Sequence, residues 1–323
     1  MDNVLKADTR RRMGCLPRSI DCSDSTYISN FMKMKKLLYI LPLIVLMAWG
    51  CEKNNYPDPE PTPTMSTVNI VDGAIEAPFS VGNGKVVYFS QGNLQYNAAT
   101  RTWRFAEAQY DALKEENKKR TSTYNGWIDM FCWGTSGYNG CMPYLMSDNY
   151  RDYPGGSDIA GTNYDWGQYN AISNGGNEQG VWRTLTRNEW DCLLGRYDKD
   201  VRPLDYIVEV HGIEGLMLLP DNFIREAVGY YSWYAGQKIS DSDWNKLQQY
   251  GAVFLPECGH LFYSSIGDSL VYSKYLDGYW TSSGCSSGVY SWHVIFLSNH
   301  ASVADNYFGV DNALPVRLVK DIQ

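Results

Sequence analysis

Between about residue 66 and the C-terminus, the segments that can form helices or strands are short, and few long periodic helices interrupt them. The segment KVVYFSQGNLQYN, residues 85–97, predicts two strands joined as a hairpin around Gln91, Gly92 and Asn93. The clearest helix begins at Thr186, where Glu189 completes a capping box three residues later. Further short elements are predicted in residues 102–106, 215–219, 239–250, 251–256, 278–284, 291–298 and 313–321. Together they predict one α+β domain over residues 67–323, with short helices and long irregular loops.

The segment SWHVIFLSNH, residues 291–300, decides where a functional face can lie. Its alternation puts Val294 and Phe296 on one side of a strand and His293, Ile295 and Leu297 on the other. We expect Val294 and Phe296 to face the core. The opposite side is then either packed under a neighbouring loop or exposed to contact a ligand, and we take exposure as the working hypothesis.

The N-terminal part of the chain has the features of an export signal. Residues 32–36, MKMKK, are basic, and an uncharged run of 14 residues follows and ends at Cys51. A membrane-spanning helix needs about 20 residues, so residues 32–50 predict a secretory signal peptide rather than an uncut anchor helix. The sequence LMAWGC resembles a bacterial lipoprotein signal box, which implies that Cys51 carries the lipid after cleavage.

Two further N-terminal segments are predicted to have no packed structure. Because a signal peptide begins a chain, Met32 or Met34 is the expected start, and residues 1–31 are interpreted as a disordered start-site artefact. Residues 51–66 are rich in proline and acidic side chains, which predicts an extended tether that holds the domain away from a membrane surface.

The exported part is acidic. Residues 1–50 hold eight of the 28 Lys and Arg residues and four of the 36 Asp and Glu residues. This leaves 20 basic and 32 acidic residues, a net charge of about −12, in the remainder. The charge argues against nucleic acid as a partner and suits a soluble extracellular surface.

Cysteine and histidine show no metal-ligand spacing. The cysteines after Cys51 are Cys132, Cys141, Cys192, Cys258 and Cys285, an odd number that leaves at least one unpaired. Cys132 and Cys141 are close enough to pair across a loop, or both are free thiols. The histidines are scattered, at positions 211, 260, 293 and 300. We therefore predict no metal, no cofactor and no catalytic residues.

Seven segments carry a resemblance to a known family. In chain order they read VYFSQGNLQYNAATRTWRFAEAQYD, YNGWIDMFCWGTSGYN, ISNGGNEQGVWRTLTRNEW, GLMLLPDNF, GAVFLPECGH, GYWTSS and PVRLVK, and they cover nearly all of residues 79–320. This ordered set resembles the domain of gut Bacteroidetes surface lipoproteins that have a C-type lectin fold. The resemblance implies a C-type lectin-like α+β domain with small antiparallel sheets, a fold shared with the formylglycine-generating-enzyme group.

Some proteins of this kind are the variable proteins of diversity-generating retroelements. In those, mutagenic reverse transcription rewrites a stretch just before the C-terminus, and the matching limits here are Tyr279–Ser282 and Val316–Val319. The resemblance implies a binding face within residues 284–313. The residues expected to point outward and to form one patch are Trp292, His293, Ile295, Leu297, His300, Ser302, Ala304, Asp305 and Tyr307. The long loop from Thr135 to Asn170 is the alternative location.

Composition also suggests how such a patch binds. A tryptophan, a tyrosine and aliphatic neighbours have the composition of a contact hot spot. His293 and His300 are expected to add pH sensitivity near their ordinary pKa of about 6.5.

Two other functions stay open. A formylglycine-generating enzyme needs a close pair of reactive cysteines, whereas Cys258 and Cys285 stand 27 positions apart in this chain. A glycan-binding module is the other alternative, because exposed Trp and Tyr stack on sugar rings, although the calcium-sugar triplets of animal lectins are not recognisable.

The sequence therefore predicts a non-enzymatic outer membrane lipoprotein, exposed at the cell surface and attached to the membrane through its lipid alone. Its expected partner is a protein, a phage or host surface ligand, or a glycan.

Overall fold

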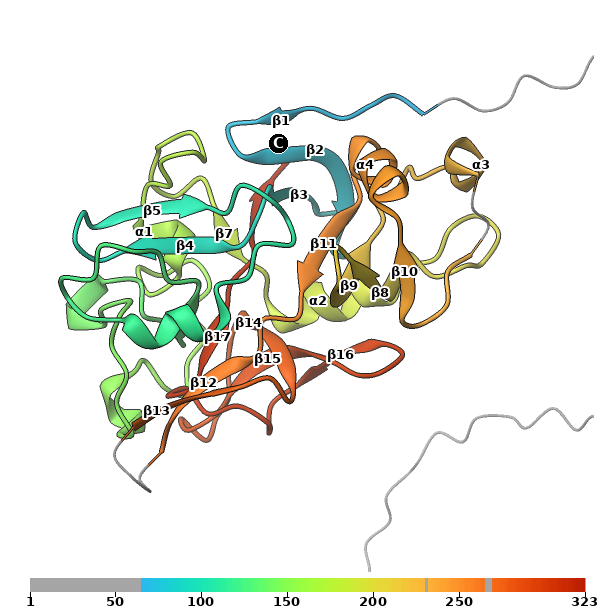
Figure 1. Cartoon of the computed structure of the whole chain (residues 1–323). Coiled ribbons are helices and arrows are strands. Elements are labelled where there is room, and N and C mark those ends of the chain that lie inside the picture. Colours follow the sequence, from blue (N-terminus) through green and yellow to red (C-terminus); the bar gives the residue numbers. More distant parts are fainter. Residues whose placement is uncertain (1–64, 230–231, 265–268, 323) are drawn as a thin grey trace, which may run out of the picture. The chain divides into compact units, whose positions relative to one another are not determined.

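Short strands form most of the regular structure within the described residues, which are 65–229, 232–264 and 269–322 of the computed structural model (Figure 1). The strands make five small sheets, antiparallel except for one pair, and the longest α-helix has nine residues. This arrangement confirms the predicted α+β class with short helices and small antiparallel sheets. The start-site, signal-peptide and tether predictions fall on residues 1–64, outside the described part, apart from Met65 and Ser66.

The first sheet joins the beginning and the end of the described chain. Its strands, in spatial order, are β1 (Ile70–Val71), β2 (Ala74–Ser80), β3 (Val86–Ser90), β18 (Leu318–Asp321) and β7 (Arg183–Thr184). The last strand, β18, lies between β3 and β7 and pairs antiparallel with both. Phe79, Phe89 and Val319 from this sheet are buried in one hydrophobic cluster with Trp190.

The predicted hairpin in residues 85–97 is wrong, although both of its strands exist. Strand β3 pairs with β2 and β18, whereas β4 (Leu94–Asn97) pairs with β5 (Thr102–Phe105). The backbone does not fold back between β3 and β4, because Gln91 N–H donates to the carbonyl of Gly73 and Leu94 N–H donates to that of Val316. Turn-forming residues are a local signal, and here distant backbone partners determine the pairing.

The longest helix packs against the second sheet. Its strands, in spatial order, are β10 (Gln237–Ile239), β8 (Asp205–Val210), β9 (Ile213–Leu218) and β11 (Val253–Pro256), with β10 parallel to β8. Helices α3 (Arg225–Val228) and α4 (Asp241–Gln249) contact each other, and Trp244 of α4 is buried with Phe254 of β11. The predicted strands that end at Pro220 and Pro256 and the helix between them are confirmed.

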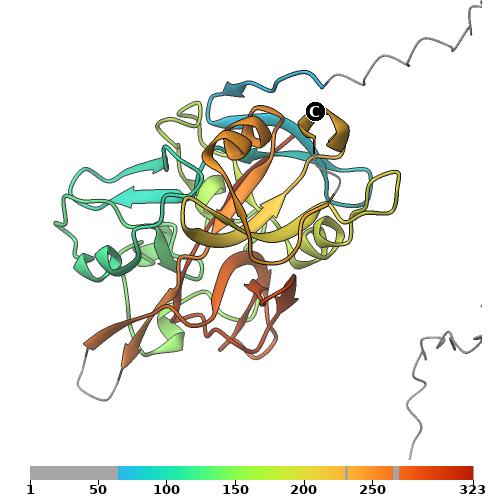
Figure 2. The ribbon, with the colours of Figure 1, turned by 45° about the vertical axis from the view of Figure 1, so that its right-hand side comes forward.

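The third sheet holds a long hairpin. Its strands, in spatial order, are β13 (Ser269–Ser273), β12 (His260–Ser264), β17 (Ala313–Pro315) and β6 (Met130–Cys132). Figure 2 shows β12 and β13 extending away from the rest of the body. The remaining short helices lie in loops; they are η1 (Lys114–Lys119), η2 (Tyr138–Gly140), η3 (Tyr150–Asp152) and α1 (Trp166–Tyr169).

The fourth sheet contains the segment on which the functional prediction rests. Its strands are β14 (Asp277–Gly284), β15 (Ser291–Phe296) and β16 (Ala301–Ala304), and helix α2 (Arg187–Leu194) contacts all three (Figure 1). The predicted capping box at the start of α2 is confirmed, because the Thr186 hydroxyl accepts from Glu189 N–H and the Glu189 carboxylate accepts from Thr186 N–H.

None of the helices in the described part is both long and apolar enough to cross a membrane.

Candidate ligand-binding surface

Strand β15 is buried on both of its faces. Val294 and Phe296 belong to the hydrophobic cluster that includes Trp190 and Leu193 of α2. Ile295 belongs to a different cluster, on the opposite side of the sheet, together with Phe308. Ile295 is 3% exposed and His293 is 0% exposed, so the prediction that these two side chains point outward is wrong.

The cover on the second face comes from the chain after β16. Phe308 is buried, and its ring centroid lies 4.9 Å from that of His293. The ring of Trp280 in β14 lies 6.0 Å from His293 on the same side. Alternation within β15 predicts a core face correctly, but it carries no information about a covering segment that lies 12 residues or more away in the chain.

Trp292 is half-buried and faces the α2 side, not the side of His293 and Ile295. The Arg187 guanidinium lies 3.5 Å from the centroid of its ring, which is a close cation–π contact. Trp292 therefore joins β15 to the first turn of α2.

The other predicted contact residues separate into two groups. Leu297, which is half-buried, and His300, which is exposed, lie at the β15–β16 turn, where Leu297 N–H donates to the His300 carbonyl. Asp305, half-buried, and Tyr307, 50% exposed, lie at the other end of the strand pair. At about 3.3 Å per residue these ends are roughly 15 Å apart, so the predicted contact residues are divided between the two ends of the strand pair. Half-buried Ser302 and Ala304 lie in β16 between them.

His293 does not provide the pH sensitivity that its type suggested. Burial lowers the pKa of His293 to about 4. Its Nδ1–H donates to the Ser291 carbonyl at 2.8 Å, and its Nε2 has no hydrogen-bond partner among the described residues. The imidazole is therefore a neutral core residue at neutral pH.

A cavity of about 580 Å³ opens at the Asp305–Tyr307 end of the sheet, within the loop that was the alternative location. It is lined by Tyr138, Pro154, Gly155, Ser157, Asp158, Ile159, Thr162, Asn163 and Tyr164. These residues were not predicted individually. The aromatic, glycine-rich segment of residues 125–140 indicates a loop, but it contains one of them, Tyr138, and does not show which side chains converge.

Tyrosine packing forms one wall of the cavity. The Tyr138 ring meets Tyr164 edge-on at 5.1 Å and Tyr169 at 5.4 Å. The Tyr164 hydroxyl accepts from the Asn139 amide at 3.2 Å. Ser136 Oγ donates to the Asn163 carbonyl at 2.6 Å and so fixes the backbone beside the rings.

The opposite wall is attached to β14 and to the loop before β15. Ile159 N–H donates to the Ser282 carbonyl at 2.9 Å, and Gly284 N–H donates to Asp158 Oδ1 at 2.8 Å. Gly155 lies directly against the next loop, since a Cβ there would be 2.3 Å from the carbonyl oxygen of Gly288. The cavity therefore adjoins the predicted binding region of residues 284–313.

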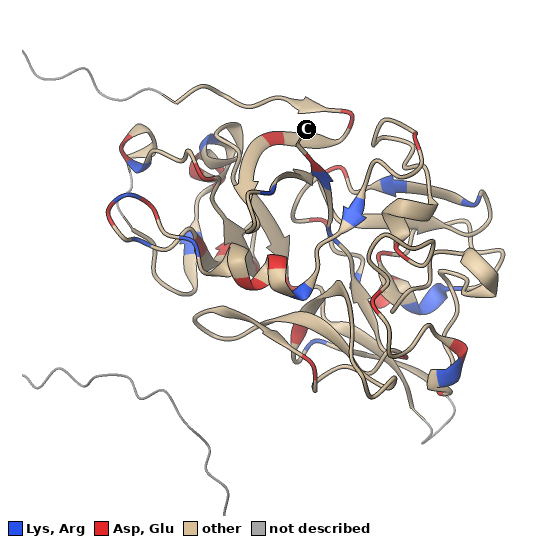
Figure 3. Ribbon diagram, turned by 180° about the vertical axis from the view of Figure 1, so that it is seen from behind, with Lys and Arg blue, Asp and Glu red and all other residues tan. Residues whose placement is uncertain are grey.

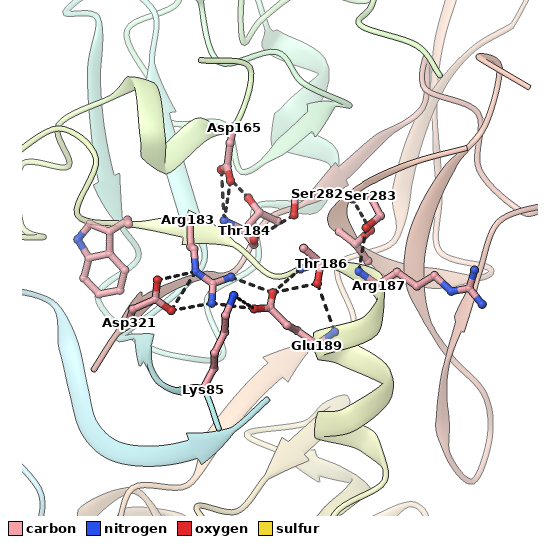
Figure 4. Close-up of polar contacts among 12 residues, drawn as sticks. Lys85, Asp165, Arg183, Thr184, Thr186, Arg187, Glu189, Ser282, Ser283 and Asp321 are labelled. Carbon is pink, nitrogen blue, oxygen red and sulfur yellow. Dashed lines mark hydrogen bonds and ion pairs between the residues drawn. The ribbon is translucent and has the colours of Figure 1, made fainter. Parts of the chain in front are cut away.

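A buried polar network joins the cavity loop to strands β7 and β14 (Figure 4). Asp165, next to Tyr164, accepts from Thr184 N–H, from the Thr184 hydroxyl and from Gly167 N–H. The Ser282 hydroxyl donates to the Thr184 carbonyl at 3.1 Å. Despite these bonds, burial raises the pKa of Asp165 to about 6. The network connects the cavity loop, β7 and β14.

The same network continues to the N-terminus of α2. Arg183 donates to both oxygens of Glu189 at 2.9 Å and to Asp321 at 2.7 Å, and the Ser283 hydroxyl accepts from Arg187 N–H (Figure 4). Burial raises the pKa of Glu189, but the hydrogen bonds from Arg183 and Thr186 outweigh this effect and lower it. The Arg183 guanidinium also lowers the pKa of Asp321. These charges are paired with one another and hold the scaffold.

A second, smaller cavity of about 250 Å³ lies between the other loops. Its lining contains Lys114, Glu214, Glu257, Tyr272, Lys274 and Asp277 among other residues. Burial, together with Asp277 and Glu214, raises the pKa of Glu257 to about 7. Within the described residues no group of three or more His, Cys, Asp or Glu could hold a metal ion.

The cysteines of the described part are free thiols, so the Cys132–Cys141 disulfide is not formed. Cys132 Sγ instead contacts Met146 Sδ, and Cys141 Sγ lies 3.7 Å from the Asp152 carbonyl oxygen. Cys258 is buried beside Tyr279, whereas Cys285 is half-buried in the loop before β15.

Basic and acidic residues are interspersed along the chain rather than gathered in one element (Figure 3). Figure 3 shows Lys and Arg interspersed with Asp and Glu across the ribbon. The larger cavity has one charged lining residue, Asp158, and no lysine or arginine. Its lining is otherwise aromatic, aliphatic and hydroxyl- or amide-bearing.

No protein family, no curated protein and no solved structure matches the chain.

Proposed function

We propose that this chain is a lipid-anchored, non-enzymatic ligand-binding protein of the bacterial cell surface, with a C-type lectin-like domain. The ordered sequence segments described above support the fold, and the signal box ending at Cys51 supports the anchor. The mixed α+β arrangement of small antiparallel sheets is compatible with such a domain.

One observation carries the binding function. The 580 Å³ cavity and the exposed ends of residues 284–313 adjoin one another, and both rest on a buried, hydrogen-bonded scaffold. Rigid support beneath an exposed aromatic surface is the arrangement expected for a contact site. The binding region is therefore the end of the sheet that carries Tyr290 and Tyr307, which are 41% and 50% exposed.

The proposal extends to the origin of the binding face: this chain is a diversified protein of a retroelement. In that case the positions free to vary are exposed ones such as Tyr290 and Tyr307, and the buried His293 and Ile295 are scaffold. The flanking DNA tests this: a near-identical template repeat beside a reverse transcriptase gene supports it, and their absence contradicts it.

The anchor is tested on the membrane-fraction protein. We expect mass spectrometry to find a mature N-terminus at a lipidated Cys51, and a Cys51→Ala variant to stay unlipidated. Recovery of a mature chain that still contains Ile40 contradicts the prediction.

The binding surface is tested with a displayed random-peptide library selected on the full mature chain. Peptides that bind the wild type should bind a Tyr290→Ala, Tyr307→Ala double variant at least tenfold more weakly, since aromatic anchors dominate contact energies. The matched control replaces Tyr197 and Tyr275, which are 59% and 76% exposed on other segments. Equal losses in both double variants place the contact elsewhere.

A further inference from the structure

We propose that the 580 Å³ cavity binds a pyranose ring of a neutral glycan. This inference rests on the proposed binding function and names the ligand class for one part of that surface. The volume lies within the range of about 300–1,000 Å³ that small-ligand sites occupy. The lining combines two tyrosines with short polar side chains, the composition that a ring with one apolar face and a hydroxyl periphery requires.

The aromatic component is fixed before a ligand arrives. Tyr138 is held between Tyr164 and Tyr169 by edge-on contacts at 5.1 and 5.4 Å. Both Tyr138 and Tyr164 line the cavity and are half-buried, so each keeps part of its ring surface available. The electron-rich face of an aromatic ring attracts the positive edge of C–H groups, which a pyranose presents on its apolar face.

The polar component is unpaired within the described residues. Ser157, Asn163 and Tyr138 line the cavity, and the Ser157 hydroxyl, the Asn163 side-chain amide and the Tyr138 hydroxyl make no hydrogen bond to a described residue. They offer both donors and acceptors, as sugar hydroxyls do. Asp158 uses Oδ1 to accept from Gly284 N–H, which leaves Oδ2 as a charged acceptor for a ligand hydroxyl.

The electrostatics favour a neutral ligand. The single charged group of the lining is a carboxylate, and it has no lysine or arginine beside it in the cavity. An acidic sugar would place like charges close together, which is unfavourable. A neutral sugar has no charge to repel the Asp158 carboxylate, and its hydroxyl groups can donate hydrogen bonds to it.

Backbone contacts reduce the cost of binding. The Thr162 hydroxyl donates to the Ile159 carbonyl at 2.8 Å and accepts from Tyr164 N–H at 3.2 Å. Together with the bonds from Ile159 and Asp158 to β14, these fix the floor before binding. A site whose side chains are already ordered loses less entropy when a ligand binds.

The test uses the purified full mature chain and a panel of methyl glycosides of glucose, galactose, mannose and N-acetylglucosamine, with methyl glucuronide as the acidic probe. Saturation-transfer NMR and calorimetry measure binding. We expect at least one neutral glycoside to bind and the glucuronide to bind more weakly than its glucose counterpart. Asn163→Ala and Ser157→Ala should each weaken the neutral ligand about tenfold or less, the effect of losing one hydrogen bond.

The controls separate this inference from the function on which it rests. Both variants alter exposed side chains without partners, so circular dichroism should show an unchanged fold. A Tyr290→Ala, Tyr307→Ala variant should retain glycoside binding and lose peptide binding. If no glycoside binds, or if the affinity is unchanged in both cavity variants, the sugar inference is overturned. In that case, peptide binding that still depends on Tyr290 and Tyr307 upholds the proposed function. If the wild-type chain binds neither glycosides nor peptides, the proposed function is rejected as well.

Discussion

Ile295 lies in the interior because two separate parts of the chain meet strand β15. Its neighbours Val294 and Phe296 face the cluster that includes α2, while Ile295 itself faces the cluster that includes Phe308. Sequence alternation predicted the first of these faces. The second could not be predicted, because Phe308 stands in a turn-rich segment with no strand or helix period.

At the residue scale, burial on both faces predicts equal sensitivity to charge. Ile295→Asp should destabilise the domain by several kcal/mol, as Val294→Asp should, because each buries a carboxylate without a partner. Ser298→Asp, at an exposed position just after β15, should change stability by less than about 0.5 kcal/mol. Chemical denaturation measures all three, and a stable Ile295→Asp protein would show that this side chain is exposed after all.

At the element scale, helix α2 depends on its first turn. Thr186→Ala removes the hydroxyl that accepts from Glu189 N–H, and it should lower the free energy of unfolding by about 1 kcal/mol. Thr121→Ala, at an exposed turn position, is the matched control. An unchanged denaturation midpoint in Thr186→Ala would contradict the capping role.

The contact between Arg187 and Trp292 gives a second prediction for the same helix. Their guanidinium-to-ring distance of 3.5 Å predicts a coupling of about 0.5–1 kcal/mol in a double-mutant cycle of the two alanine variants. Strictly additive effects would mean that Trp292 does not brace α2. Trp292 would then be available as the ligand contact that its sequence position first suggested.

Local chemistry explains which elements the sequence predicted. The capping box at Thr186 and the prolines at positions 220 and 256 act within a few residues. The capping box begins α2, and the two prolines stand at the C-terminal ends of β9 and β11. The cavity depends instead on contacts such as Gly284 with Asp158, which are 126 positions apart. The sequence therefore offered this loop only as the alternative location, and the convergence of its side chains is visible only in the folded chain.

Across the whole molecule, several carboxyl groups are held in places that disfavour their charge. Asp129, Asp165, Asp205 and Asp277 have pKa values raised to about 6, in each case chiefly by burial. His293 acts in the opposite sense, because its pKa is lowered to about 4. Desolvation raises the pKa of Asp198, but hydrogen bonds, above all the one from Arg225, lower it to about 2. Asp198 therefore affects the stability of the protein only in stronger acid.

These shifts predict that the protein is more stable at pH 5 than at pH 7.5. A carboxyl with a raised folded-state pKa binds more protons in the folded than in the unfolded state between about pH 4 and pH 6, so stability falls as pH rises through that window. The lowered pKa values of His260 and His293 act in the opposite direction, because they make the folded protein more stable as pH rises. Five carboxyl groups, the four aspartates and Glu257, oppose these two histidines. Asp165→Asn keeps an acceptor for Thr184 and removes one titration, so it should reduce the pH 5 to pH 7.5 difference by about 1 kcal/mol. Thermal denaturation at both pH values decides it, and a wild-type protein that is more stable at pH 7.5 would contradict the raised pKa values of these carboxyl groups.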